Sequence, residues 1–155
     1  MFVSRIMTKN PISVDPCDSL EKVLDILTKN RISGCPVVDG KRLLGVITES
    51  DIIRIIDVHT KIHKPESGLF PLILAVIKDE KYDALKSALK DVLSLKVKTF
   101  MSKKAVTIDV NDDVYKAARL LNRHDIDRLP VTENKKLVGI ITRWDLIRAL
   151  DKLEK

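Results

Sequence analysis

The sequence contains the same stretch of residues twice. Residues 3–57 align without a gap on residues 97–151, at a constant offset of 94, and 19 of the 55 aligned positions are identical. A match that keeps its register over such a length predicts two copies of one structural unit. We therefore divide the 155 residues into a first copy at 1–57, a linker at 58–96 and a second copy at 97–155.

Each copy shows the pattern of a β-α-β-β-α unit. In the first copy, an apolar stretch at Ile12–Val14 precedes a segment with the i, i+3, i+4, i+7 apolar spacing of a helix face, and Asp18 is placed to cap that helix. Two strands then surround a turn at Asp39–Gly40, before a final helix. The second copy repeats this pattern from Val106–Ile108, with Asp112 at the cap. The expected fold class is α/β of the α+β type, two pseudo-symmetric units packed as a pair with an inserted helical linker.

The final helix of each copy is apolar on nearly its whole circumference, with Arg54 or Arg148 as its main polar interruption. A helix of this kind must be buried on two sides. Its own sheet covers one side, and the other most simply meets the second copy or a partner chain, so we expect a homodimer. Trp144, the only tryptophan, lies in this segment. We favour a partly buried packing role for it over a base-stacking or subunit contact.

The linker has two parts. Its first part is broken by Pro65, Gly68 and Pro71, which predicts a loop. Its second part has the spacing of an amphipathic helix, which pads the module, adds to a dimer surface or gates a ligand site; the sequence does not choose between these roles. The residues on the apolar face of this helix are Tyr82, Leu85, Leu89 and Val92.

Composition and charge argue against several classes of function. The net charge is +6, but the first copy is balanced and the basic excess of the second copy is scattered, so we do not expect a nucleic-acid partner. Cys17 and Cys35 form no C-x-x-C pair, and His59 and His63 lack a third ligand, so we expect no metal site. No uncharged apolar run approaches the roughly 20 residues of a membrane span. We therefore expect a cytoplasmic protein without a membrane partner.

A threonine and an aspartate, three residues apart, follow the last strand of each copy. They are Thr48 and Asp51 in the first copy, and Thr142 and Asp145 in the second. One interpretation is a capping box, although the usual partner there is Glu or Gln and the shorter Asp reaches back less easily. The other is a ligand site, because a carboxylate accepts two hydrogen bonds from a cis-diol such as ribose and the amides of a helix start favour phosphate. One residue can fill both roles.

These features resemble the tandem CBS domain family, the paired module named after cystathionine beta-synthase. The resemblance covers about 110 of the 155 residues. It rests on the leading I-M-T and F-M-S, the apolar strands at Pro36 and Pro130, and G-h-h-T-x-x-D (h is apolar), all repeated at one offset. It implies a regulatory module that needs no cofactor and senses an adenosine-containing ligand: AMP, ADP, ATP, S-adenosylmethionine or NAD. The protein that such a module would regulate is not identified by the sequence.

The resemblance also implies two clefts, each combining the T-x-x-D of one copy with the first strand and the pre-proline segment of the other. Family members that bind nucleoside phosphates often carry a basic residue three positions before the proline, where this chain has Ser33 and Asp127. Asp127 repels phosphate unless Arg128 compensates, so we expect the Asp145 cleft, with its neutral walls, to be occupied first. Carried onto this chain, Thr48 and Asp51 face Val106, Ile126, Asp127 and Arg128, while Thr142 and Asp145 face Ile12, Ile32, Ser33 and Gly34.

Two functions of different classes follow from the sequence. The first is the ligand-sensing module. The alternative is a nucleic-acid-binding CBS protein that uses the basic surface of the second copy. We do not expect an enzyme or any catalytic residue, because the sequence offers no nucleophile-base pair and no glycine-rich phosphate loop. The ligand-sensing interpretation is the one we carry forward.

Overall fold

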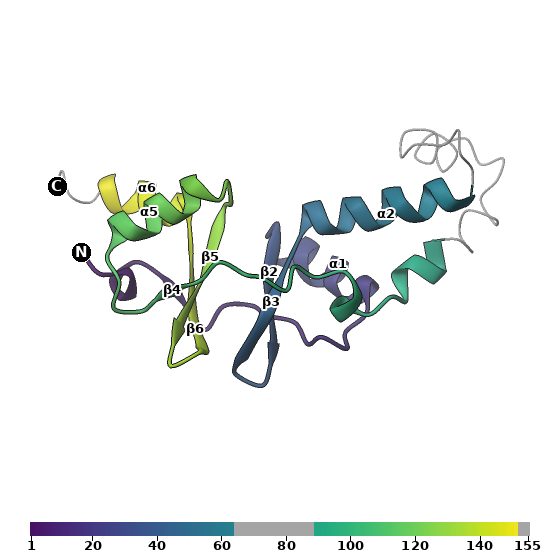
Figure 1. The fold of residues 1–155 in the computed structure, drawn as a ribbon, viewed down its shortest axis with the longest axis horizontal. Coiled ribbons are helices and arrows are strands. Elements are labelled where there is room, and N and C mark those ends of the chain that lie inside the picture. The colour runs from purple at the N-terminus through teal and green to yellow at the C-terminus, as the bar shows by residue number, and fades with distance from the viewer. Residues whose placement is uncertain (64–88, 152–155) are drawn as a thin grey trace. The chain divides into compact units, whose positions relative to one another are not determined.

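A computed structural model describes residues 1–63 and 89–151 of the chain (Figure 1). They form two compact units, each assembled from separated stretches of sequence. Unit 1 contains Met1–Ser13, Pro36–Gly45 and Lys103–Lys155, and unit 2 contains Val14–Cys35 and Val46–Ser102.

Some expectations for the linker lie outside the described residues. These are the loop around Pro65, Gly68 and Pro71, and the placement of Tyr82 and Leu85. The side chains of His59 and His63 are likewise not described. Within the described part of the linker, residues 89–93 are helical and Val92 is buried.

Unit 1 is a small sheet covered by two helices of the second copy. Strand β5 pairs in parallel with β4 and antiparallel with β6, and both α5 and α6 pack against these strands (Figure 1). This arrangement is the predicted β-α-β-β-α order. The elements are β4 (Ile108–Asp109), α5 (Val114–Arg123), β5 (Arg128–Glu133), β6 (Lys136–Thr142) and α6 (Arg143–Asp151).

The core of unit 1 lies between this sheet and α5. Ala117 and Leu121 are four residues apart and therefore lie on one face of α5, where both are buried. Leu129 and Val131 alternate along β5 and point to one side of the sheet. The buried cluster consists of Val3, Ile108, Ala117, Leu121, Leu129, Val131 and Ile141.

Unit 2 contains the helices of the first copy, α1 (Leu20–Asn30) and α2 (Glu49–His63), with a short 3-10 helix, η2 (Val97–Thr99). Helix α1 buries Leu20, Val23 and Leu27 and leaves Leu24 half-buried, so the i, i+3, i+4, i+7 face predicted from the sequence is the face that packs inward. The strands of the first copy, β2 (Gly34–Asp39) and β3 (Arg42–Thr48), are divided between the two units, because Pro36–Gly45 belongs to unit 1.

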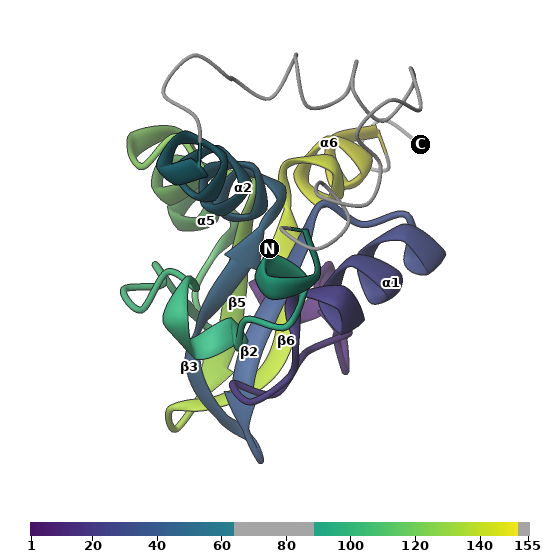
Figure 2. The same cartoon turned by 90° about the vertical axis from the view of Figure 1, so that its right-hand side faces the viewer.

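Both copies contain the predicted hairpin. Strands β2 and β3 are neighbours joined by a short turn, as Figures 1 and 2 both show. Gly40 has φ of +60° in this turn, a left-handed conformation that glycine adopts without steric cost. In the second copy, Asn134 and Lys135 take the corresponding turn with φ of 50° and 66°. The Asp39–Gly40 turn predicted from the sequence is therefore confirmed.

The leading residues of the two copies are exchanged between the units. In unit 1, the first copy supplies η1 (Val3–Arg5) and β1 (Thr8–Lys9), and Thr8 pairs with Ile140 of β6. In unit 2, the second copy supplies Ser102, which forms an antiparallel bridge with Val46. The repeat of the sequence and the compact unit of the structure are therefore different sets of residues.

Two local expectations are wrong by a small margin. Ile12–Val14 forms no strand, since Val14 alone makes a β-bridge. The helix caps are Ser19 and Asp113, each one residue later than expected. The carboxylates of Asp18 and Asp112 instead accept the backbone N–H of the residue three positions earlier, at 2.9 and 3.0 Å, and so close the turn before each helix. A hydrogen bond from the Lys116 ammonium holds the pKa of Asp112 below its usual range.

The first prediction concerns Gly139, where β1 meets β6. A Cβ at this position would lie 2.5 Å from Met7 Sδ and 3.0 Å from the Thr8 carbonyl oxygen. We expect Gly139→Ala to lower the free energy of unfolding by about 1–3 kcal/mol, because the added methyl overpacks the contact with β1. Denaturant unfolding, followed by circular dichroism, measures this loss.

The close contact with Met7 provides a control for this prediction. Met7→Ala removes the sulfur that the new methyl would meet, so the double variant Gly139→Ala/Met7→Ala should lose less stability than the sum of the two single variants. Strictly additive losses would show that the Met7 contact is not the cause.

Candidate functional site

The two T-x-x-D segments form the same strand-to-helix junction. Thr48 ends β3 and Thr142 ends β6, and a helix begins at the next residue in each case. Asp51 and Asp145 therefore lie in the first turns of α2 and α6. Their exposed fractions are only 3% and 5%. Since burying a charged carboxylate is costly, each needs hydrogen-bond partners within the protein.

One oxygen of each carboxylate is held by the threonine. Asp51 Oδ2 accepts hydrogen bonds from the backbone N–H and the hydroxyl of Thr48, both at 2.9 Å, and Asp51 N–H donates back to the hydroxyl at 3.4 Å. Asp145 repeats these contacts with Thr142, at 2.8, 2.7 and 3.3 Å. This reciprocal pattern is a capping box, with Asp reaching back where Glu is usual. The capping interpretation is therefore confirmed in both copies.

The other carboxylate oxygen is bound by an arginine three residues later. Arg54 Nη2 lies 3.2 Å from Asp51 Oδ1, and Arg148 Nη2 lies 2.5 Å from Asp145 Oδ1. The arginine side chains are 67% and 57% exposed, so a buried anion is joined to a solvent-facing cation. Our sequence reasoning treated these arginines only as polar interruptions. The sequence did offer one signal, because the same arginine stands at aligned positions of the two copies.

Asp51 has a further partner in the second copy. The hydroxyl of Ser102 donates to Asp51 Oδ1 at 3.3 Å, within unit 2. Sequence reasoning missed this residue, which belongs to the leading F-M-S. At the equivalent position in the first copy, Thr8 lies in β1 and is exposed. The two carboxylates therefore differ in their surroundings although their own segments match.

The pre-proline segment lies beside the T-x-x-D junction of its own copy. The Ser33 carbonyl accepts the N–H of Glu49 at 2.9 Å, and the Asp127 carbonyl accepts the N–H of Arg143 at 3.1 Å. Arg143 Nε also lies 3.1 Å from Asp127 Oδ1. The negative charge of Asp127 is thus paired with Arg143, and compensation by Arg128 stays a prediction.

The predicted site residues divide between the two units. The structure brings Thr48, Asp51 and Ser33 together in unit 2, and Thr142, Asp145 and Asp127 together in unit 1. The pairing expected across the copies joins residues of different units, so it stays a prediction. The remaining residues are Ile32 and Gly34 in unit 2, and Ile12, Val106, Ile126 and Arg128 in unit 1.

Among residues 1–63 and 89–151, no group of three or more His, Cys, Asp or Glu side chains is placed to hold a metal ion. Across the same residues, no helix combines the length and the apolar character needed to cross a bilayer.

Comparison with known proteins identifies a repeated domain. The family model of the CBS domain matches residues 3–58 and 97–152. The uncharacterized protein MJ1404 of Methanocaldococcus jannaschii is 30% identical over 154 residues, which are 99% of this chain and 32% of that protein. The chain thus spans about a third of the length of this relative.

Solved structures share the fold. The crystal structure of CBSX2 in complex with AMP matches with a TM-score of 0.73 at 23% identity, covering 99% of this chain and 98% of the other. The CBS domain pair of protein MJ0100, in complex with 5'-methylthioadenosine and S-adenosyl-L-methionine, matches with a TM-score of 0.66 at 22% identity, covering 100% and 98%.

The second prediction tests the capping box. Thr48→Val removes the hydroxyl that bonds to both the carboxylate and the N–H of Asp51, and we expect it to lower the free energy of unfolding by about 1 kcal/mol. Thr48→Ser keeps the hydroxyl and is the matched control. Urea unfolding measures both variants, and equal stability of the two would contradict the role assigned to the hydroxyl.

Proposed function

Because the chain belongs to the CBS domain family and carries the domain twice, we propose that it is a ligand-sensing regulatory module that binds an adenosine-containing ligand. The observation that carries this proposal is the pair of buried carboxylates, Asp51 and Asp145, each with one oxygen fixed and the other bound to an exposed arginine. The two carboxylates hold the ribose hydroxyls.

The geometry of each carboxylate suits a diol. The threonine fixes Oδ2, so the orientation of Oδ1 is set before a ligand arrives and little ordering cost remains. Ribose hydroxyls donate to Oδ1 and replace the arginine. The released guanidinium of Arg54 or Arg148 then pairs with a ligand phosphate where one is present. This exchange accounts for both phosphorylated and unphosphorylated adenosine ligands.

The solved relatives support this ligand class. CBSX2 is described in complex with AMP, and the MJ0100 pair with 5'-methylthioadenosine and S-adenosyl-L-methionine. All three compounds contain adenosine, and they differ in what is attached to the ribose. We propose the adenosine class for this chain on the combination of the shared fold and the two carboxylates.

The two sites differ in expected occupancy. Asp51 already accepts a hydrogen bond from Ser102, which a ribose must displace or share. We propose that the Asp145 site binds first, with walls from Ile12, Ile32, Ser33 and Gly34. The site of Asp51 uses Val106, Ile126, Asp127 and Arg128, and there the Asp127 carboxylate, which is paired with Arg143, disfavours polyphosphates only weakly.

The third prediction tests ribose binding. We expect at least one of AMP, ADP, ATP, NAD and S-adenosylmethionine to stabilise the wild type against heat, by about 2.7 kcal/mol at 100 times its dissociation constant. Asp145→Asn keeps the shape but removes the charge, so we expect affinity at that site to fall about tenfold or more. Asp51→Asn should lower the affinity of the second binding event. Isothermal titration calorimetry resolves the two binding events.

The controls for binding are Asp57→Asn and Asp151→Asn. These residues lie six positions after the site aspartates in the same helices and carry the same charge change. They should bind like the wild type. The proposal is wrong if no adenosine compound binds, or if Asp51→Asn and Asp145→Asn both bind with unchanged affinity.

An exposed apolar stripe on α6 supports a homodimer. Trp144 is 63% exposed, so our expectation of a partly buried packing side chain is wrong. Ile147 and Leu150 are also exposed and follow at three-residue intervals on the same face. On α2, Ile53 is exposed at the position equivalent to Ile147. We propose that a second copy of the chain covers these faces, because adjoining exposed apolar side chains mark interaction sites.

The fourth prediction tests this assembly. Ile147→Glu places a charge in the stripe, and we expect it to dissociate the dimer, as measured by sedimentation velocity. Trp144 fluorescence should shift to longer wavelength in the same variant, since the indole becomes wet. Tyr115→Ser, on the exposed face of α5, is the control and should remain dimeric. A monomeric wild type would contradict the proposed dimer.

A further inference from the structure

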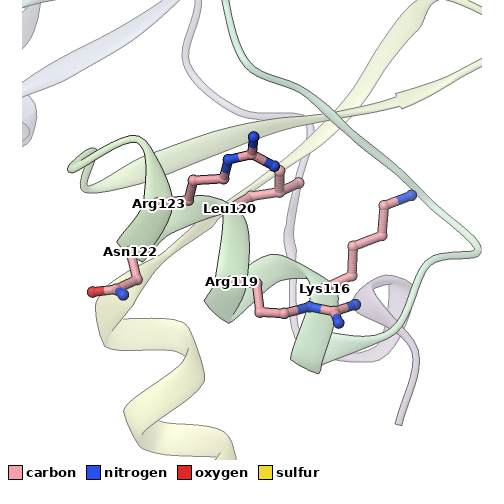
Figure 3. Close-up of a pocket in the computed structure, with 5 residues that line it drawn as sticks. All are labelled: Lys116, Arg119, Leu120, Asn122 and Arg123. Carbon is pink, nitrogen blue, oxygen red and sulfur yellow. The ribbon is translucent and has the colours of Figure 1, made fainter.

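The exposed face of α5 carries a row of cations around a shallow hollow. Lys116, Arg119, Leu120, Asn122 and Arg123 line this hollow, whose volume is about 510 Å³ (Figure 3). Leu120 lies between the basic side chains, and the four others are exposed. The surface therefore combines an apolar patch with a basic border.

The first copy provides an internal comparison for this face. In α1, the equivalent positions form two ion pairs: Lys22 with Asp18 at 2.7 Å, and Lys29 with Asp25 at 2.9 Å. Within α1 itself, the charges of the four ionised side chains cancel. These side chains are Glu21, Lys22, Asp25 and Lys29.

Helix α5 keeps only one of these two pairs. Lys116 bonds to Asp112 at 2.8 Å, as Lys22 does to Asp18. Arg119 stands where α1 has Asp25, so Arg123 has lost the partner that Lys29 has. Neither arginine forms an ion pair with any residue in the described part of the chain. Like charges four residues apart destabilise a helix, although Arg123 gains from its place in the last turn.

Tyr115 extends this surface toward the helix start. It is 75% exposed, at the position where α1 has Glu21. Since it lies four residues before Arg119, the two side chains are neighbours on one face of the helix. An exposed aromatic ring beside guanidinium groups offers a stacking platform for a nucleic-acid base.

We propose that this face of α5 binds single-stranded nucleic acid. Arg119 and Arg123 contact phosphates along about 6 Å of helix, and a base stacks on Tyr115. Of three nearby acids, Asp112 is paired with Lys116, while Asp125 and Asp127 share the single charge of Arg143. The proposal is independent of the adenosine sites, which use other residues.

Charge and ring together favour a nucleic acid over an acidic protein segment. Carboxylates would satisfy the two arginines equally well, but they give no role to the exposed ring. A single strand uses both, because its phosphates pair with the cations and its bases stack. A duplex keeps its bases stacked inside, so it leaves Tyr115 unused.

The fifth prediction uses fluorescence anisotropy with a labelled strand of about 20 thymidines, titrated between about 50 and 200 mM salt. Arg119→Ala/Arg123→Ala should weaken binding about tenfold or more at the lowest salt. The slope of log affinity against log salt should fall in magnitude by about 1.4, since two phosphate contacts are lost at about 0.7 each. Tyr115→Ala should weaken binding about fivefold or more, and Tyr115→Phe should not.

The matched control is Lys22→Ala/Lys29→Ala. It removes two charges from α1 at equivalent helix positions, so both double variants have the same net charge. We expect the control to bind within twofold of the wild type with the same salt slope. Circular dichroism checks that every variant is folded. Arg119→Gln removes one charge and keeps a long polar side chain, so it disturbs the helix less than the double variant does.

Three results would overturn the proposal. One is a wild type that does not bind the strand at the lowest salt. Another is an equal loss in both double variants, which would show attraction by net charge alone. The third combines two observations: Tyr115→Ala binds the strand as tightly as the wild type, and poly-glutamate competes for binding as well as the unlabelled strand does. Together they would assign this face to an acidic protein.

Discussion

The hydrogen bonds between a threonine and a buried aspartate support the rest of the architecture. Each copy turns from its last strand into its last helix at this pair. The carboxylate accepts the N–H of the threonine, and the threonine hydroxyl accepts the N–H of the aspartate, so two amides without helical partners are satisfied. Because Oδ2 is committed to the threonine, Oδ1 faces the arginine with little freedom. One interaction therefore sets the helix start, solvates a buried charge and presents an acceptor for a ligand.

The local parts of the fold were predictable from the sequence because local residues determine them. The turn at Gly40 needs a left-handed backbone, and Asp39–Gly40 is a strong signal for it. The buried face of α1 follows from the spacing of Leu20, Val23 and Leu27. The exchange of leading segments was not predictable in this way, since pairing between Thr8 and Ile140 leaves no periodic trace in either stretch.

The candidate site was predictable to a similar extent. Thr48 and Asp51 stand out because they recur at one offset, next to a strand end. Arg54 recurs as Arg148, but an arginine on an amphipathic helix usually faces water, so this recurrence did not indicate a contact with the buried Asp51. Ser102 joins Asp51 from 51 residues away, which only the tertiary structure reveals. Trp144 was misjudged because burial depends on neighbours that a helix pattern does not specify.

The exchange of leading segments also affects synthesis of the chain. The strand at Thr8–Lys9 leaves the ribosome well before its partners Gly139 and Ile140, which lie 130 or more residues later. At 5–20 residues per second, this strand waits roughly 7 to 26 s for its partner. An early segment of the chain thus pairs late, and during that interval its strand edge stays unpaired.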